Sequence, residues 1–248
     1  MSKIYGFHHI CFDKNGKEVF EEQLGKIKES GLYNASETIF CSVLGERNNY
    51  TFPTKYKIIY ESVKSTSYER PILEYMYKHS KDNEGKYWYI HTKGISHHGK
   101  STYPRVEDWR KYMEFFVIKR WRRCASDLDN YDIAGVNYMS NPCHFSGNFW
   151  WARAKYVRNN KPNFKGVDYY ETEMWLSKGN PAPVGISYHS SNTMHYEKTY
   201  PASKYEPETT RQLPLIFTPG LSEANCNSSY NNNILNYENY EPIAKWNH

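Results

Sequence analysis

The first 94 residues alternate between apolar runs and segments whose apolar residues recur at helical spacing. Aromatic and β-branched runs, which are typical of buried strands, cover residues 4–12, 38–44, 57–63 and 87–90. Amphipathic helices are predicted between strands, the first ending at Gly31 and the second opening at Pro71. Strands that alternate with helices favour parallel βαβ units with helices on both faces of the sheet.

The second half of the chain carries one long helix and several short elements. Its longest amphipathic stretch has acidic residues in the first turn and arginines near the end, so it predicts a helix over residues 104–128. The shorter elements are strands at 132–137 and 184–189, a strand or loop rich in glycine and aromatic residues at 145–152, and an acidic helix at 169–177.

The patterning predicts one α/β domain over residues 1–200 with a mixed, mostly parallel sheet. Residues 1–94 resemble a nucleotide-binding half, although they contain neither G-x-G-x-x-G nor G-x-x-x-x-G-K-[ST]. From about residue 201 the periodicity fades and Asn, Ser, Tyr and Pro accumulate, so residues 201–248 are expected to form a tail packed on the domain.

Composition narrows the class of partner. The 248 residues include 32 basic and 27 acidic side chains, and the formal net charge of +5 suits an anionic small ligand better than a nucleic acid. Five scattered cysteines without a C-x-x-C pair indicate neither a disulfide framework nor a zinc knuckle. No stretch approaches the roughly 18 apolar residues of a membrane span, and we expect a cytoplasmic protein.

Polar clusters follow the predicted elements where they end. The strand at 87–90 runs into His91, Thr92, Lys93 and Gly94, and in open α/β sheets ligands bind beyond the carboxyl ends of the strands. The other clusters are His8-His9, the segment from His144 to Trp151, Asp168 to Glu173, and the region around His189. In a wound sheet these clusters could converge on one site.

Several of these motifs, in this order, resemble a group of glycosyltransferase-like proteins of bacteria and large DNA viruses. The motifs are His91-Thr92-Lys93-Gly94, Asp108-Trp109-Arg110, Gly135-Val136-Asn137, Ser146 to Ala152 and Glu171 to Trp175. The His-Thr-Lys element also resembles the rhamnan-synthesis protein F family. The match covers about residues 87–176 and implies a GT-A-like, Rossmann-like domain in which residues 95–200 form the acceptor half. It also implies transfer of a sugar from a nucleoside diphosphate sugar to a glycan hydroxyl.

The resemblance assigns the donor side of the site to basic and polar residues. In GT-A enzymes the corresponding strand ends in Asp-x-Asp, which holds a divalent metal on the donor diphosphate, whereas His91-Thr92-Lys93 stands here. Lys93 could stabilise the diphosphate directly, or His91 and His189 could ligate Mn²⁺ or Mg²⁺. The literal Asp127-Leu-Asp129 falls at a helix end and is interpreted as a solvated terminus. The expected donor-binding residues are His8, His9, His91, Thr92, Lys93 and Arg153.

The acceptor side is expected to supply a base and a sugar-binding surface. Inverting transfer needs a carboxylate that removes the acceptor proton, for which Glu173 is the first choice, with Glu171 and Asp168 as alternatives. Neighbouring Trp150 and Trp151 point to opposite faces of a strand, so one is expected in the core and one at the site. The expected sugar-binding residues are His144, Gly147, Asn148, Trp150 and Trp151.

Two other classes of protein compete with this interpretation. A lectin-like protein would use the same Trp and Asn residues to bind carbohydrate without turnover. A metal-dependent hydrolase built on the ten histidines is less favoured, because no H-E-x-x-H or comparable ligand spacing occurs.

Overall fold

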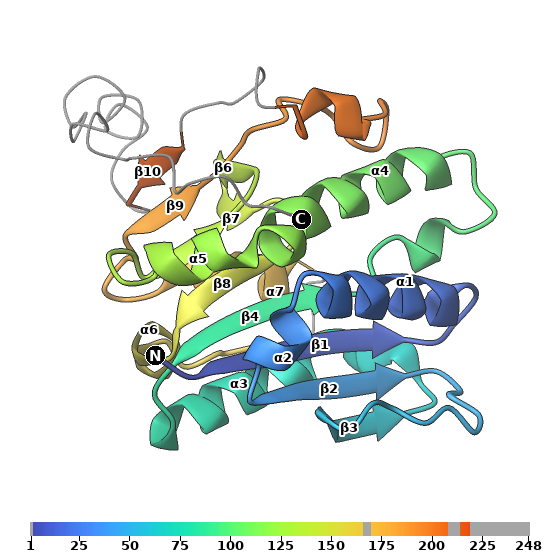
Figure 1. The fold of residues 1–248 in the computed structure, drawn as a ribbon, viewed down its shortest axis with the longest axis horizontal. Coiled ribbons are helices and arrows are strands. Elements are labelled where there is room, and N and C mark those ends of the chain that lie inside the picture. Colours follow the sequence, from blue (N-terminus) through green and yellow to red (C-terminus); the bar gives the residue numbers. More distant parts are fainter. Residues whose placement is uncertain (1, 166–169, 208–213, 219–248) are drawn as a thin grey trace.

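Eight strands form one mixed sheet in the order β10-β9-β5-β8-β4-β1-β2-β3 (Figure 1). The structure is a computed structural model that describes residues 2–165, 170–207 and 214–218. The strands of the sheet are β1 (Ile4–Cys11), β2 (Thr38–Leu44), β3 (Tyr56–Ser62), β4 (Lys86–His91), β5 (Ile133–Gly135), β8 (Trp150–Arg153), β9 (Gly185–Ser187) and β10 (Leu215–Phe217). A separate hairpin pairs β6 (Tyr138–Ser140) with β7 (Cys143–Phe145).

Strand directions divide the sheet into two parts. Strands β4, β1, β2 and β3 are parallel, as the alternation of strands and helices predicted. Strand β8 runs antiparallel between β4 and β5, whereas β9 is parallel to β5 and β10 is antiparallel to β9. The predicted α/β class with a mixed, mostly parallel sheet is confirmed, and the sheet extends into the predicted tail through β10.

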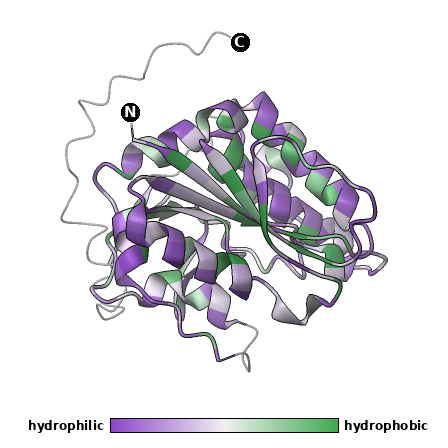
Figure 2. Ribbon diagram, turned by 90° about the horizontal axis from the view of Figure 1, so that it is seen from below, coloured by the Kyte–Doolittle hydropathy of each residue, from purple (hydrophilic) through white to green (hydrophobic). Residues whose placement is uncertain are grey.

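Helices cover both faces of the sheet, and hydrophobic residues gather on the strands between them (Figure 2). One face packs against α1, α4 and α5, and the other against α3 and α6. The helices are α1 (Gly16–Glu29), α2 (Leu32–Ala35), α3 (Arg70–Asp82), α4 (Tyr103–Glu114), α5 (Trp121–Asp127), α6 (Ala154–Asn159) and α7 (Glu171–Met174). Short 3₁₀ turns lie at Ser65–Ser67, Ile95–His97, Leu176–Lys178 and Ala202–Lys204.

The predicted continuous helix over residues 104–128 is wrong in one respect. A π-helical segment, Phe115–Lys119, separates α4 from α5, and Arg120 leaves the helical conformation. The indole Nε1–H of Trp151 donates to the carbonyl of Val117 at 2.9 Å within this segment. Side chains that bond to helix carbonyls in this way accompany such interruptions, and here the bond joins the π-helical segment itself to β8.

Close packing of the central strands fixes the position of β4. A Cβ atom at Gly6 of β1 would lie 2.2 Å from the ring of Trp88 on β4, so only glycine lets the indole cover β1. Trp88 is fully buried, and its Nε1–H donates to Ser36 at 3.1 Å. The register of β1 and β4 brings their carboxyl ends to one edge of the sheet, where His9 pairs with His91.

None of the helices in the described ranges is both long enough and apolar enough to cross a membrane.

Candidate functional site

The last residue of β4, His91, is held at one ring nitrogen. Nε2 lies 3.0 Å from the carbonyl oxygen of Gly147, and because a carbonyl oxygen only accepts, Nε2 carries the proton. Burial, and then the charge of Lys93, lower the pKa of His91 from 6.5 to about 3, so the ring is neutral. Its Nδ1 therefore presents a lone pair, 3.8 Å from Oε1 of Glu69.

Glu69 is a site residue that the sequence interpretation missed. It immediately precedes α3, and its Oε2 accepts hydrogen bonds from the Tyr89 hydroxyl at 2.6 Å and from Asn148 Nδ2 at 2.5 Å. The remaining oxygen faces His91. The signal in the sequence is an acidic residue just before the predicted helix that opens at Pro71, a position where a negative charge is favourable for the helix dipole alone.

The turn at residues 146–148 joins His91 to the acidic helix α7. Gly147 has φ +92°, and a Cβ atom there would lie 2.4 Å from Sδ of Met113, so two independent constraints require glycine. Its carbonyl accepts from His91, and its N–H donates to Oε1 of Glu173 at 2.6 Å. Trp150 Nε1 fixes the next residue, since it donates to Oδ1 of Asn148 at 2.7 Å.

Glu173 and Glu171 have different surroundings although both lie on α7. Glu173 is bonded through Oε1 to the Gly147 N–H, its Oε2 has no hydrogen-bond partner in the described part of the chain, and His144 Nε2 lies 3.9 Å from Oε1. Glu171 forms an ion pair with Arg70 at 2.7 Å and accepts the N–H of Lys165. Glu173 is therefore better placed to take a proton. The other candidate base, Asp168, lies outside the described residues.

Lys93 extends over an aromatic ring rather than toward a carboxylate. Its Nζ lies 3.8 Å from the ring centroid of Trp109, and no ion pair within 4.0 Å involves it in the described ranges. Burial lowers the pKa of Lys93, and the negative charges of Glu173 and Glu69 act in the opposite direction. Its neighbour Thr92 accepts the N–H of Cys11 at 2.9 Å, so Thr92 joins β4 to β1 instead of facing a ligand.

A ring stack lies beneath Lys93. Trp109 and His195 are parallel to within 3°, with centroids 4.9 Å apart, and Tyr196 meets Trp109 edge-on. Two buried nitrogens in this stack, Trp109 Nε1 and His195 Nδ1, have no hydrogen-bond partner among the described residues. The sequence interpretation had not connected the segment around residue 195 with Trp109, because no spacing rule relates positions so distant.

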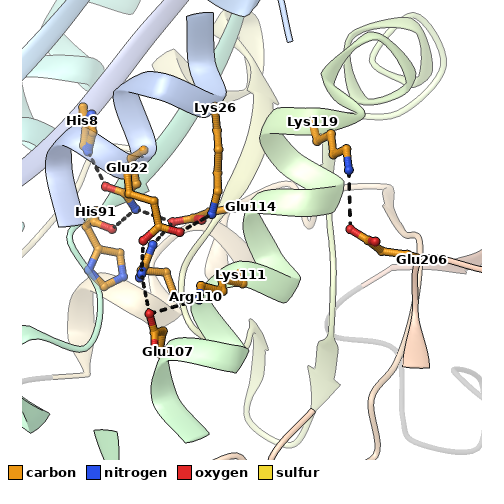
Figure 3. A network of polar contacts seen from close by, with 11 residues as sticks. His8, Glu22, Lys26, His91, Glu107, Arg110, Lys111, Glu114, Lys119 and Glu206 are labelled. Carbon is orange, nitrogen blue, oxygen red and sulfur yellow. Dashed lines mark hydrogen bonds and ion pairs between the residues drawn. The ribbon is translucent and has the colours of Figure 1, made fainter. Parts of the chain in front are cut away.

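Behind His91, a buried polar network ties α1 and α4 to β4 (Figure 3). Gln23 Nε2 donates to the His91 carbonyl and to Glu114, each at 2.9 Å. Glu114 also accepts from Arg110 at 2.8 Å and from Lys26 at 2.5 Å. Arg110 and Glu114 are almost completely buried. Burying either charge without the other would cost folding free energy, because the remaining charge would have no partner. These hydrogen bonds and ion pairs hold Gln23 in place, and Gln23 in turn fixes the backbone carbonyl of His91.

Several predicted site residues lie elsewhere. His8 belongs to the network, since its Nε2 donates to Gln23 at 2.9 Å, and His9 is buried against Ser42 at 2.8 Å. Arg153 pairs with Lys86 at the start of β4, whereas His91 is at the other end of that strand. The Arg153 side chain donates to the carbonyl of Leu128. Arg153 therefore lies away from the carboxyl edge. His8 and His9 lie near the carboxyl end of β1, but both rings are buried and bonded to neighbouring side chains.

Both tryptophans of β8 are buried, on opposite faces of the sheet. Trp151 packs in the core beside α4 and α5, whereas Trp150 packs on the other face and supports Asn148 from behind. Neither ring is more than 1% exposed, so the expectation that one of them covers a bound sugar is wrong. A strand with neighbours on both sides and helices on both faces leaves no exposed position for either ring.

A divalent cation fits these residues poorly. No group of three or more His, Cys, Asp or Glu side chains in the described ranges is arranged to hold a metal. His189 does not join His91, because its Nε2 bonds the Tyr200 hydroxyl at 2.8 Å and its ring packs on Phe116. The ammonium of Lys93 already places positive charge beside His91.

The fold and the site define an α/β protein with a polar, partly exposed site at the carboxyl edge of its central strands. The family model described as "Domain of unknown function (DUF8361)" matches residues 7–174 of the 248-residue chain. The chain therefore belongs to this family. No curated protein matches the sequence.

Proposed function

We propose that the chain is a nucleotide-sugar-dependent glycosyltransferase that transfers a sugar to a glycan hydroxyl. The observation that carries this proposal is that a half-buried ammonium, Lys93, and a carboxylate, Glu173, lie near the same rigid turn at Gly147. Lys93 lies over the ring of Trp109, which packs against this turn, and Glu173 accepts the N–H of Gly147. A transferase needs positive charge at the departing diphosphate and a base at the incoming hydroxyl. Both groups are present, and each is positioned by hydrogen bonds or ring contacts to the core.

Lys93 is assigned to the leaving group. When the bond between the anomeric carbon and the diphosphate oxygen breaks, its electron pair stays on the diphosphate, whose negative charge increases. An ammonium that forms no ion pair with the described carboxylates and is held against an aromatic face is poised to stabilise that charge. No step in this mechanism passes through a metal.

Glu173 is assigned to the acceptor. Its Oε2 takes the proton of the acceptor hydroxyl while the hydroxyl oxygen forms the new bond to the anomeric carbon. The N–H of Gly147 fixes Oε1 and thereby aims the second oxygen. Attack from the face opposite the departing diphosphate makes the reaction inverting.

The nucleoside end of the donor has a candidate location near the carboxyl ends of β1 and β2. A cavity of about 560 Å³ lies there, lined by residues that include Lys14, Lys17, Arg47 and Tyr50. This volume is in the range of small-molecule sites. Lys14 also donates to the carbonyl of Ser96 at 3.2 Å, which connects this cavity to the loop that follows Lys93.

The proposal includes a cytoplasmic location. Four cysteines in the described ranges, Cys11, Cys41, Cys124 and Cys143, are unpaired thiols. Free thiols of this kind are usual where glutathione and thioredoxin keep cysteines reduced.

A thermal-shift panel of nucleoside diphosphate sugars, with and without Mn²⁺, tests the proposal, because ligands that bind only the native state raise its Tm. We expect at least one donor to raise Tm without added metal, and the same donor to release its nucleoside diphosphate when a glycan acceptor is present. Carbohydrate binding without release would support a lectin-like protein. No shift with any donor would refute the transferase.

A further inference from the structure

Two exposed tyrosines, and not the tryptophans of β8, lie near Glu173. Tyr170 and Tyr196 are 58% and 48% exposed, whereas Trp150 and Trp151 are buried. The two tyrosines come from separate segments, one at the start of α7 and one from the segment that follows β9. Their exposure leaves ring surface available to a molecule that approaches the carboxylate.

Tyr196 is held in place by neighbouring rings. It meets Trp109 edge-on at 5.5 Å and 84°, and its centroid lies 5.4 Å from that of His97. Trp109 also packs against the turn that holds Glu173, because a Cβ atom at Gly147 would lie 3.1 Å from the Trp109 ring and the Gly147 N–H donates to Glu173. Desolvation, followed by the charge of Glu173, raises the pKa of Tyr196, in agreement with this arrangement. Tyr196 is therefore a half-exposed aromatic ring anchored near the turn that holds the carboxylate.

Tyr170 is tied to Glu173 through the backbone. Its carbonyl accepts the N–H of Glu173 at 3.1 Å and that of Met174 at 3.1 Å, so it forms the N-terminal end of α7. The short helix fixes Tyr170 relative to the proposed base. Two exposed aromatic rings thus lie near one carboxylate whose Oε2 has no partner in the described part of the chain.

We propose that Tyr170 and Tyr196 form a saccharide-binding surface that holds the acceptor sugar against Glu173. Aromatic faces carry partial negative charge and favour the C–H face of a pyranose, while a carboxylate accepts hydrogen bonds from hydroxyl groups. The occupant is an uncharged pyranose with a hydroxyl directed at Glu173. The role of this surface in catalysis rests on the proposed function, whereas the binding of the sugar does not.

Saturation-transfer NMR with methyl pyranosides of glucose, galactose, mannose, rhamnose and N-acetylglucosamine tests the surface directly. We expect ring C–H signals from at least one of these probes with the full chain. Tyr196→Ala and Tyr170→Ala are each expected to weaken its binding by about tenfold or more, equivalent to about 1.4 kcal/mol. Tyr196→Phe, which keeps the ring, should bind like the unmodified chain.

Tyr60→Ala is the matched control, because Tyr60 is 36% exposed but lies on the edge strand β3. It should bind the probe normally. If no probe bound, or if the Tyr→Ala variants bound as tightly as the unmodified chain, the proposed saccharide-binding surface would be refuted. Donor-induced thermal shifts are measured on the same variants and should not change. Saccharide binding without any donor shift would refute the transferase reaction and leave the surface standing.

Discussion

His91 Nε2 and the carbonyl oxygen of Gly147 lie 3.0 Å apart, although 56 positions separate the two residues in the sequence. The same glycine donates its N–H to Glu173 at 2.6 Å. One peptide turn therefore fixes the imidazole at the end of β4 on one side and the proposed base on the other. The geometry of the candidate site depends on this turn more than on any single side chain.

Gly147→Ala should damage both stability and activity. The φ of +92° disfavours any side chain, and the new Cβ would collide with Met113, so we expect a loss of about 2–4 kcal/mol in the free energy of unfolding. Gly99→Ala is the control, because Gly99 has φ +79° with open space around it. Urea unfolding of both variants measures the difference. Equal losses would show that contact with Met113 is unimportant.

Glu173→Gln should lower kcat by about 10²- to 10⁴-fold, since an amide cannot take the proton of the acceptor hydroxyl. Donor binding should be retained, because the amide oxygen can still accept the Gly147 N–H. Glu171→Gln serves as the matched variant, because Glu171 pairs with Arg70, and its kcat should change little. Steady-state release of nucleoside diphosphate measures both. Full turnover by Glu173→Gln would remove Glu173 from the mechanism.

Stability should fall on acidification because of buried neutral histidines. Burial lowers the pKa of His8 and His91 to about 3 and that of His9 to about 4, against 6.5 for an exposed histidine. Between about pH 6.5 and pH 4 the unfolded chain binds more protons than the folded chain. The free energy of unfolding therefore decreases as pH falls through this range.

Replacing one such histidine should reduce this dependence. His8→Gln is expected to lower the slope of unfolding free energy against pH by up to about 1.4 kcal/mol per pH unit below pH 6. His98→Gln, at an exposed position, should leave the slope unchanged. Urea titrations at pH 4.5, 5.5 and 7 provide the slopes. An unchanged slope for His8→Gln would mean that His8 is protonated in the folded chain.

The parallel half of the sheet could be predicted because each strand is a long apolar run separated by helices. The position of β8 could not, and two errors about the site follow from it. An antiparallel strand carries its carboxyl end to the opposite edge, so Arg153 lies far from His91 whereas Asn148, which precedes the strand, lies close. The central position of β8 also buries Trp150 and Trp151.

Residues at the ends of the parallel strands were easier to identify. The placement of His91, Lys93 and Glu173 around one turn agrees with the convergence expected at the carboxyl edge. Glu69 was missed as a site residue because its partners, Tyr89 and Asn148, come from segments that meet it only in the folded chain. Hydrogen bonds between distant segments leave no periodic signal in the sequence.

The central claim is that the ammonium of Lys93 binds the diphosphate of the donor. Calorimetric titration of UDP and GDP in the presence of EDTA tests it most directly, with Lys93→Met to retain packing on Trp109 and exposed Lys100→Met as the control. We expect Lys93→Met to bind the preferred nucleotide about 10- to 100-fold more weakly and Lys100→Met to bind it normally. Equal affinity of Lys93→Met and the unmodified chain would contradict the account.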